Sequence, residues 1–254
     1  MTSNGPLEDT IEEAERVADA ARAQKVAVKL LGGAGIHLHS PSSHRAPLRR
    51  KYGDLDYVIT GKDRKAALAF FPSIGYEANE RFNLMQGDRR LYFFDGNNGK
   101  QVDVFIDVIR MSHVIDLRGR LGHNGPCASP SDLMLSKLQI YEVNRKDLVD
   151  LTALVLDHPI ASKDDEAIDA TYVARLAADD WGLYRTLQIN LEKLRHTVAD
   201  LDVDRDLVNS RLDELWTVVE AQAKPLKWRM RAQVGDRMRW YELPEEVRSP
   251  YQPE

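Results

Sequence analysis

The chain has 254 residues, of which 43% are hydrophobic and 30% charged, so it is neither a disordered nor a fibrous protein. It contains no apolar run of about 18 residues, so neither a membrane span nor a membrane partner is expected. Its formal net charge of −5 argues against a protein coated with nucleic acid, but not against a local basic groove.

The cysteine usage and the N-terminal sequence predict a cytoplasmic protein. Cys127 is the single cysteine and cannot form an internal disulfide, which favours a reducing compartment. The first nine residues lack the basic and apolar regions of a secretory signal. Nothing near Cys127 in the sequence marks its thiol as an activated nucleophile.

The first predicted elements are a helix, a strand and a glycine turn. Over residues 9–23, Thr10 and Glu13 fit a capping box at the start of an amphipathic pattern. The apolar run over residues 26–31 predicts a short buried strand that ends at Gly32-Gly33. Such a turn lets backbone N–H groups approach a ligand closely, and it suits a phosphate.

The rest of the N-terminal half predicts further strands, and the C-terminal half predicts helices. We therefore predict an α+β fold, in which a mixed sheet flanked by helices (residues 1–125) precedes a helical domain (residues 126–254). The predicted elements are a surface loop at 40–47, a strand at 55–60, a helix at 62–71, strands at 91–95 and 102–109 joined by a Gly/Asn-rich hairpin turn, helices that begin at Ser129 and near Asp147, and two or three helices between 164 and 238.

Asp54-Leu55-Asp56 is the first motif that indicates chemistry. The two carboxylates are one residue apart at the start of a strand pattern, so both point to the same face. Two like charges so close repel unless a cation lies between them, and the usual cation is a divalent metal with oxygen ligands. Taken alone, the motif is also typical of a solvated turn.

The order of these motifs resembles a known superfamily. Gly32-Gly33, then Asp54-Leu55-Asp56, then the acidic strand Val102-Asp103-Val104 is similar to the nucleotidyltransferase superfamily, with its polymerase-β-like fold, over roughly the first 110 residues. Residues 132–139 and 145–151 look like the helical motifs of its AbiEii/MenT-type branch, which includes toxins of bacterial and mycobacterial toxin–antitoxin systems.

The resemblance implies a metal-dependent transfer of a nucleoside monophosphate from an NTP, such as ATP, to a hydroxyl acceptor. The implied acceptor is a tRNA 3′ end, a small molecule or a protein hydroxyl, and an antitoxin protein is an implied partner. The resemblance implies that Asp54, Asp56 and Asp103 bind Mg²⁺ or Mn²⁺. It implies that the N–H groups of Gly32 and Gly33 bind phosphates. It also implies that the positive charge of Lys137, helped by Arg50 or Arg49, binds the β or γ phosphate.

Several of these residues also have simpler interpretations. Asp107 shares a strand face with Asp103 and is the alternative third acid, although a strand-end residue facing water is the more common case. Lys137 alone would be taken for a surface lysine. Asp147 and Asp150 are either pocket residues or first-turn acids that a helix dipole favours.

Two other classes of function compete with the transferase. His37, His39 and His44 suggest a metal hydrolase as a less favoured alternative, because His-x-His after a strand is a known ligand spacing but no further ligands are evident. The alternative to both enzymes is a catalytically inactive nucleotide-binding or regulatory protein. Dinucleotide binding is not predicted, because Gly32 to Gly35 do not fit the pattern GxGxxG.

The C-terminal residues 224–241 concentrate cations and aromatic residues in an acidic protein. Such a segment is either a stacking and phosphate-binding surface for RNA or an amphipathic terminal helix. We favour the helix, with its apolar side chains docked on the core, namely Leu226, Trp228, Met230 and Val234.

Overall fold

The computed structural model describes residues 5–122, 125–164 and 166–243, so the first four residues of the N-terminal stretch lie outside it. The main sheet has the strand order β1-β2-β5-β4-β3, in which β2 and β5 are parallel and the other pairs antiparallel. Its strands are β1 (Lys29–Leu30), β2 (Leu55–Ile59), β3 (Glu77–Ala78), β4 (Arg90–Asp95) and β5 (Lys100–Ile106).

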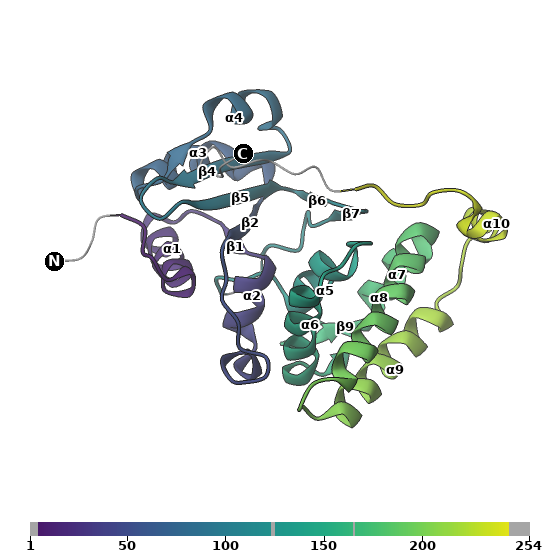
Figure 1. Ribbon diagram of the computed structural model, residues 1–254. Helices are drawn as coiled ribbons and strands as arrows, with labels where there is room; N and C mark the ends of the chain where they lie inside the picture. Colours follow the sequence, from purple (N-terminus) through teal and green to yellow (C-terminus); the bar gives the residue numbers. More distant parts are fainter. Residues whose placement is uncertain (1–4, 123–124, 165, 244–254) are drawn as a thin grey trace.

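Helices flank this sheet and then form a separate group, as predicted, so the α+β class is confirmed (Figure 1). The helices next to the sheet are α1 (Thr10–Gln24), α2 (Gly32–His39), α3 (Arg64–Ser73) and α4 (Glu80–Gln86). The later helices are α5 (Pro130–Leu138), α6 (Arg145–Asp157), α7 (Ala170–Asp179), α8 (Trp181–Ala199), α9 (Arg205–Ala221) and α10 (Leu226–Val234). Two small sheets pair β6 (Val108–Arg110) with β7 (Val114–Asp116), and β8 (Ile160–Ala161) with β9 (Ile168–Asp169).

The main sheet separates two hydrophobic cores, and strand alternation assigns each side chain to one of them. In β2, Tyr57 and Ile59 belong to the core that includes residues of α1 and α3. Val58, between them, belongs to the second core, which contains residues of helices α5 to α9. The second face of the sheet is therefore the one that meets the helical region.

The strand predicted at 55–60, the helix at 62–71 and the strand at 91–95 match β2, α3 and β4 in position. The strand predicted at 102–109 is broken at Asp107 into β5 and β6, which belong to different sheets. Two details at the N-terminus are also wrong. Gly32-Gly33 is not a turn; it begins helix α2, because burial in the core outweighs the poor helix propensity of glycine. The capping box is also wrong. Asp9 caps α1 and accepts hydrogen bonds from the N–H groups of Ile11 and Glu12 at 2.8 and 3.1 Å.

Several elements were not predicted. The short strand β3 and the helix α4 lie in a stretch without clear periodicity. Within the described residues 166–243 there are four α-helices rather than two or three. The helix α10 also differs from the prediction, because Leu226 and Met230 are 64% and 60% exposed. Trp228 is anchored through its indole N–H, which donates to the Ala177 carbonyl at 2.9 Å.

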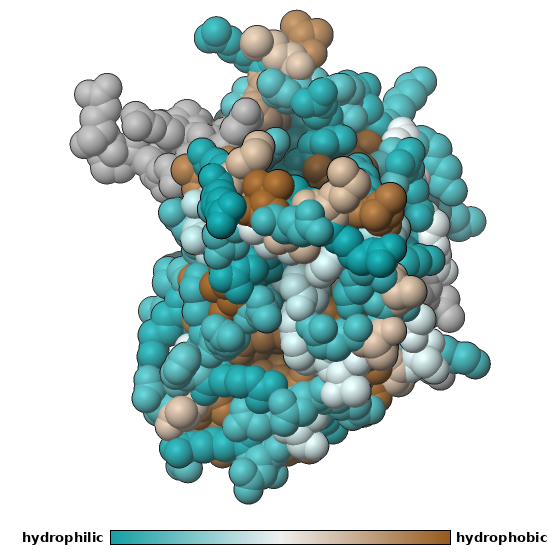
Figure 2. Space-filling view, turned by 90° about the vertical axis from the view of Figure 1, so that its right-hand side faces the viewer, coloured by the Kyte–Doolittle hydropathy of each residue, from teal (hydrophilic) through white to brown (hydrophobic). Residues whose placement is uncertain are grey.

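The molecular face that includes α9 and α10 is mostly hydrophilic, with separate apolar patches (Figure 2). Over the described ranges, no helix combines the length and the apolar character needed to cross a lipid bilayer.

Replacing Phe71 by alanine should lower the free energy of unfolding by about 3–5 kcal/mol, because the lost ring leaves a cavity in the core. Phe71 is fully buried and lies 4.7 to 5.8 Å, between ring centroids, from Tyr57, Tyr76 and Phe93. Urea unfolding measures this loss. The control Leu84→Ala removes a side chain that is 88% exposed and should change stability by less than about 0.5 kcal/mol. Equal losses in both variants would contradict the described packing.

Candidate active site

Two predicted acids lie opposite each other on the parallel strands β2 and β5. Asp56 pairs in register with Asp103, so both side chains lie on the same face of the sheet. Val58 and Phe105 continue this face into the core shared with the helical region. Asp54 lies just before β2 and is exposed. The three acids therefore gather where the sheet meets the helices.

Gly32 and Gly33 form the start of α2 beside these acids. Gly32 has a φ of +63°, which favours glycine, and a Cβ there would overlap Oδ2 of Asp56. A Cβ on Gly33 would overlap the Arg50 guanidinium and lie 2.9 Å from Oδ2 of Asp150. The first N–H groups of a helix have no partner within the helix and favour anions. This helix start therefore brings N–H groups close to Asp56 at a position that excludes a side chain.

Two ion pairs hold the cations of the site against helix α6. Nζ of Lys137 lies 2.5 Å from Oδ1 of Asp147, and Nε of Arg50 donates to Oδ1 of Asp150 at 2.7 Å. Both acids are buried. Burial opposes the charged form of Lys137, but Asp147, Asp150 and Asp56 outweigh it and raise the pKa of the lysine. Lys137 is therefore protonated between the acids of α6 and those of the sheet.

A small pocket joins three predicted residues from different parts of the chain. Gly32, Asp56 and Lys137 line a cavity of about 50 Å³, together with Phe105 and Ile140 and others. The three residues come from the start of α2, from β2 and from α5. The pocket thus combines helix N–H groups, a carboxylate and an ammonium group.

Burial raises the pKa of each predicted acid. The pKa of Asp103 rises to about 6, because burial outweighs the effect of Arg90 and the nearby Asp56 and Asp54 add repulsion. Nε of Arg90 lies 2.6 Å from Oδ1 of Asp103. Burial is the largest cause that raises the pKa of Asp56, and repulsion from Asp54 raises it further, whereas the charge of Lys137 lowers it. Burial also raises the pKa of Asp54, although the charges of Lys146 and Lys137 oppose this effect.

A magnesium ion fits the chemistry of these acids. Carboxylate oxygens are its preferred protein ligands, and a dication relieves the repulsion that raises their pKa values. Across residues 5–122, 125–164 and 166–243, no group of three or more His, Cys, Asp or Glu side chains is arranged to hold a metal. Magnesium needs only one or two protein carboxylates when it also binds substrate phosphates, so Asp54 and Asp56 meet that requirement. Asp103 as a third ligand stays a prediction.

The alternative third acid, Asp107, lies apart from this cluster. It follows β5 with a φ of +60°, and its Oδ1 accepts a hydrogen bond from the Gly61 N–H at 2.9 Å. Asp107 therefore closes a loop, whereas Asp103 lies beside Asp56.

The histidines do not form the shared site that a metal hydrolase needs. His37 and His39 lie on the helix α2, where residues two apart point to different sides. The His37 ring lies 4.2 Å from that of His44, between centroids, while His39 lies 5.6 Å from His158. Burial, and then the neighbouring His44, lower the pKa of His37 to about 4. The histidine-zinc interpretation is therefore not supported by the described residues.

Cys127 is buried. Burial raises the pKa of its thiol to about 12, which leaves no thiolate at neutral pH.

Sequence reasoning missed Arg90, which contacts Asp103. A signal was present, because the hairpin of β4 and β5 pairs Arg90 with Phe105, diagonally across from Asp103. It also left Asp147 and Asp150 undecided. Their partners became visible only when α5, α6 and the segment before β2 were placed together.

Comparisons with known proteins give weak likenesses. No protein-family model matches the sequence, and no curated protein matches it. The fold is similar to that of the antibiotic-resistance factor ANT(2'')-Ia, with a TM-score of 0.42 and 14% identity over 66% of this chain and 93% of the other. The fold is also similar to that of an antigenic nucleotidyltransferase-like protein from Paracoccidioides brasiliensis, with a TM-score of 0.38 and 16% identity over 87% of this chain and 96% of the other. At these TM-scores the likenesses assign neither a family nor an activity.

Replacing Arg50 by alanine should cost about 3–5 kcal/mol of unfolding free energy, because it leaves the buried Asp150 without its partner. The Asp150 side chain is 1% exposed. The control is Arg22→Ala, whose partner Asp19 is 74% exposed, and its expected cost is below about 1 kcal/mol. Chemical denaturation of both variants distinguishes them, and an equally small loss would show that Asp150 is not buried as described.

The unfolding free energy of the wild type, relative to Asp103→Asn, should fall as the pH rises from about 4 to about 7. The pKa of Asp103 is raised to about 6 in the folded protein, above the ~3.9 of an unfolded aspartate. The folded state therefore holds a proton that the unfolded chain has released. This stability is fully present below the unfolded pKa and is lost as the pH rises through the folded pKa, by about 3 kcal/mol. Denaturation at several pH values in EDTA measures the difference, and a constant value would contradict it.

Proposed function

We propose that this protein is a magnesium-dependent nucleotidyltransferase that moves a nucleoside monophosphate from an NTP to a hydroxyl acceptor. The observation that carries the proposal is the small pocket formed by Gly32, Asp56 and Lys137, with Asp103 beside Asp56 on the next strand. Each group has a use in this reaction, in which catalysis depends mainly on positioning phosphates and neutralising their charge.

The residues divide the work between binding and proton transfer. The N–H groups at the start of α2 and the ammonium of Lys137 bind the β and γ phosphates, where both contribute positive charge. Asp54 and Asp56 would hold magnesium or manganese, which neutralises phosphate charge and lowers the pKa of the attacking hydroxyl. Arg50, which is ion-paired with Asp150, lies beside Gly33 at the start of α2.

The reaction replaces a phosphoanhydride link of the NTP by a phosphoester link to the acceptor. The acceptor oxygen forms a bond to the α-phosphorus, the bond from that phosphorus to the bridging oxygen breaks, and pyrophosphate leaves. The hydroxyl proton goes to the Asp103 oxygen that does not bond to Arg90. In the metal-free protein burial raises the pKa of Asp103 to about 6, which brings this carboxyl toward the range of a general base.

The finer assignments follow from the sequence motifs. The resemblance to the AbiEii/MenT-type branch supports a tRNA 3′ end among the acceptors, ATP among the donors and an antitoxin protein as a partner. A cytoplasmic location suits these partners. A binding or regulatory protein without turnover is the alternative, because the pocket of about 50 Å³ is smaller than an NTP and must open to admit one.

Incubation with each α-labelled NTP, Mg²⁺ and total RNA, or with small hydroxyl compounds, should label an acceptor. Asp56→Asn and Lys137→Ala should each lower the transfer rate by roughly 10²-fold or more, since each removes charge that stabilises the transition state.

Asp107→Asn is the matched control, because it changes the same kind of group outside the cluster and should keep wild-type labelling. Equal labelling by the wild type and Asp56→Asn would refute the catalytic assignment. Nucleotide binding without labelling of any acceptor would favour the binding protein.

A further inference from the structure

A second pocket, of about 200 Å³, adjoins the acid cluster and has no role in the proposed binding of phosphates. Phe105 and Met111 line both this pocket and the smaller one at Asp56. Arg90 lines this pocket and also forms an ion pair with Asp103, so the predicted third acid lies one side chain beyond the lining. The pocket therefore lies on the Asp103 side of the site.

The pocket is cationic in an acidic protein. Arg89, Arg90 and Arg110 all line it, against the single acid Glu242. The described structure assigns Arg110 no ionic partner, and Arg89 has only an exposed contact of 3.7 Å with Asp88, which is worth little in water. These arginines therefore keep charge and N–H donors for a ligand.

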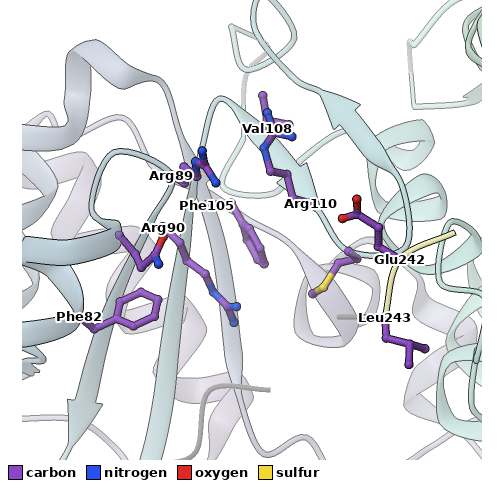
Figure 3. Close-up of a pocket in the computed structure, with 10 residues that line it drawn as sticks. Phe82, Arg89, Arg90, Phe105, Val108, Arg110, Glu242 and Leu243 are labelled. Carbon is purple, nitrogen blue, oxygen red and sulfur yellow. The ribbon is translucent and has the colours of Figure 1, made fainter. Parts of the chain in front are cut away.

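Two walls shape this pocket, as Figure 3 shows. Phe82, Arg90 and Phe105 lie on the side of the main sheet, and Glu242 and Leu243 lie on the opposite side, in the C-terminal segment. The Arg90 guanidinium lies 5.0 Å from the centre of the Phe105 ring. Apolar rings beside guanidinium groups suit a ligand with both a carbon framework and an anionic group.

The C-terminal wall is held in place by contacts outside the pocket. The Glu242 N–H donates to the Ser112 carbonyl at 3.0 Å. The Tyr241 ring stacks on that of Tyr141 with centroids 3.7 Å apart, and the Trp240 ring contacts that of Trp181. The wall is therefore formed before a ligand arrives, and its carboxylate can accept a hydrogen bond from a ligand hydroxyl.

We propose that this pocket is the acceptor subsite and that the acceptor carries a phosphate beside its hydroxyl groups, as a phosphorylated sugar does. The proposal rests on the proposed function and names its substrate class. The acceptor phosphate binds Arg89 and Arg110, and an acceptor hydroxyl reaches Asp103. The NTP phosphates occupy the other side, at Gly32 and Lys137, so the acceptor attacks the α-phosphorus from the side opposite the leaving pyrophosphate.

Direct binding tests this proposal without turnover and without metal. Isothermal titration in EDTA with ribose 5-phosphate, and separately with a single-stranded RNA trinucleotide, covers the two sources of a ribose phosphate. At least one of the two should bind, and the tighter one identifies the source. Ribose without phosphate should bind at least about tenfold more weakly than ribose 5-phosphate, because the charge-assisted hydrogen bonds are lost.

Variants then locate the bound probe. Arg110→Gln and Arg89→Gln should each weaken binding about tenfold or more, with folding checked by circular dichroism. Arg81→Gln is the matched control, because Arg81 is an exposed arginine on α4 outside the pocket lining. The control should bind like the wild type, since it changes net charge equally.

Three results would overturn the proposed acceptor subsite. Absence of binding by both probes, or equal weakening in all three variants, overturns it. Displacement of the bound probe by a non-hydrolysable NTP also overturns it, because the pocket would then belong to the nucleotide site. Failure of the proposed function is a separate result, namely probe binding as expected with no transfer from any NTP.

Discussion

The parallel pairing of β2 and β5 is the constraint on which the site depends. It sets Asp56 in register with Asp103 and directs both toward the helical region. Parallel neighbours need a long crossover connection, and here the chain passes through α3, β3, α4 and β4 before it returns as β5. A shift of register by one residue would turn Asp103 into the opposite core.

The helical region supplies the charges that make this arrangement stable. Asp147 and Asp150 are buried on α6, and an unpaired buried carboxylate is costly. Lys137 and Arg50 neutralise them and, in doing so, are fixed beside the sheet acids and the start of α2. The Lys137–Asp147 pair thus joins α5 to α6, and the Arg50–Asp150 pair joins the segment before β2 to α6, which links the two halves of the chain.

Local chemistry allowed much of this to be predicted. The spacing of Asp54 and Asp56 predicted a shared strand face, and the structure places Asp56 on β2 and Asp54 just before it. The hairpin turn residues located β4 and β5. One error arose where packing outweighs propensity, and another where apolar side chains that were expected to dock stay exposed. The segment from Gly32 to His39 is helical because it is buried against its neighbours, and α10 leaves Leu226 and Met230 exposed although its pattern favoured docking.

The family resemblance indicated Lys137, but the sequence by itself determined the α+β class, the acidic strand motif and the glycine segment. These features depend on side-chain periodicity and backbone freedom, which act over a few residues. Only the tertiary structure decided that Asp103 rather than Asp107 lies beside Asp56, that Arg90 contacts Asp103, and which acids hold Lys137 and Arg50. Those contacts join residues far apart in the chain, and their partners are selected by sheet register and helix packing, which no local pattern records.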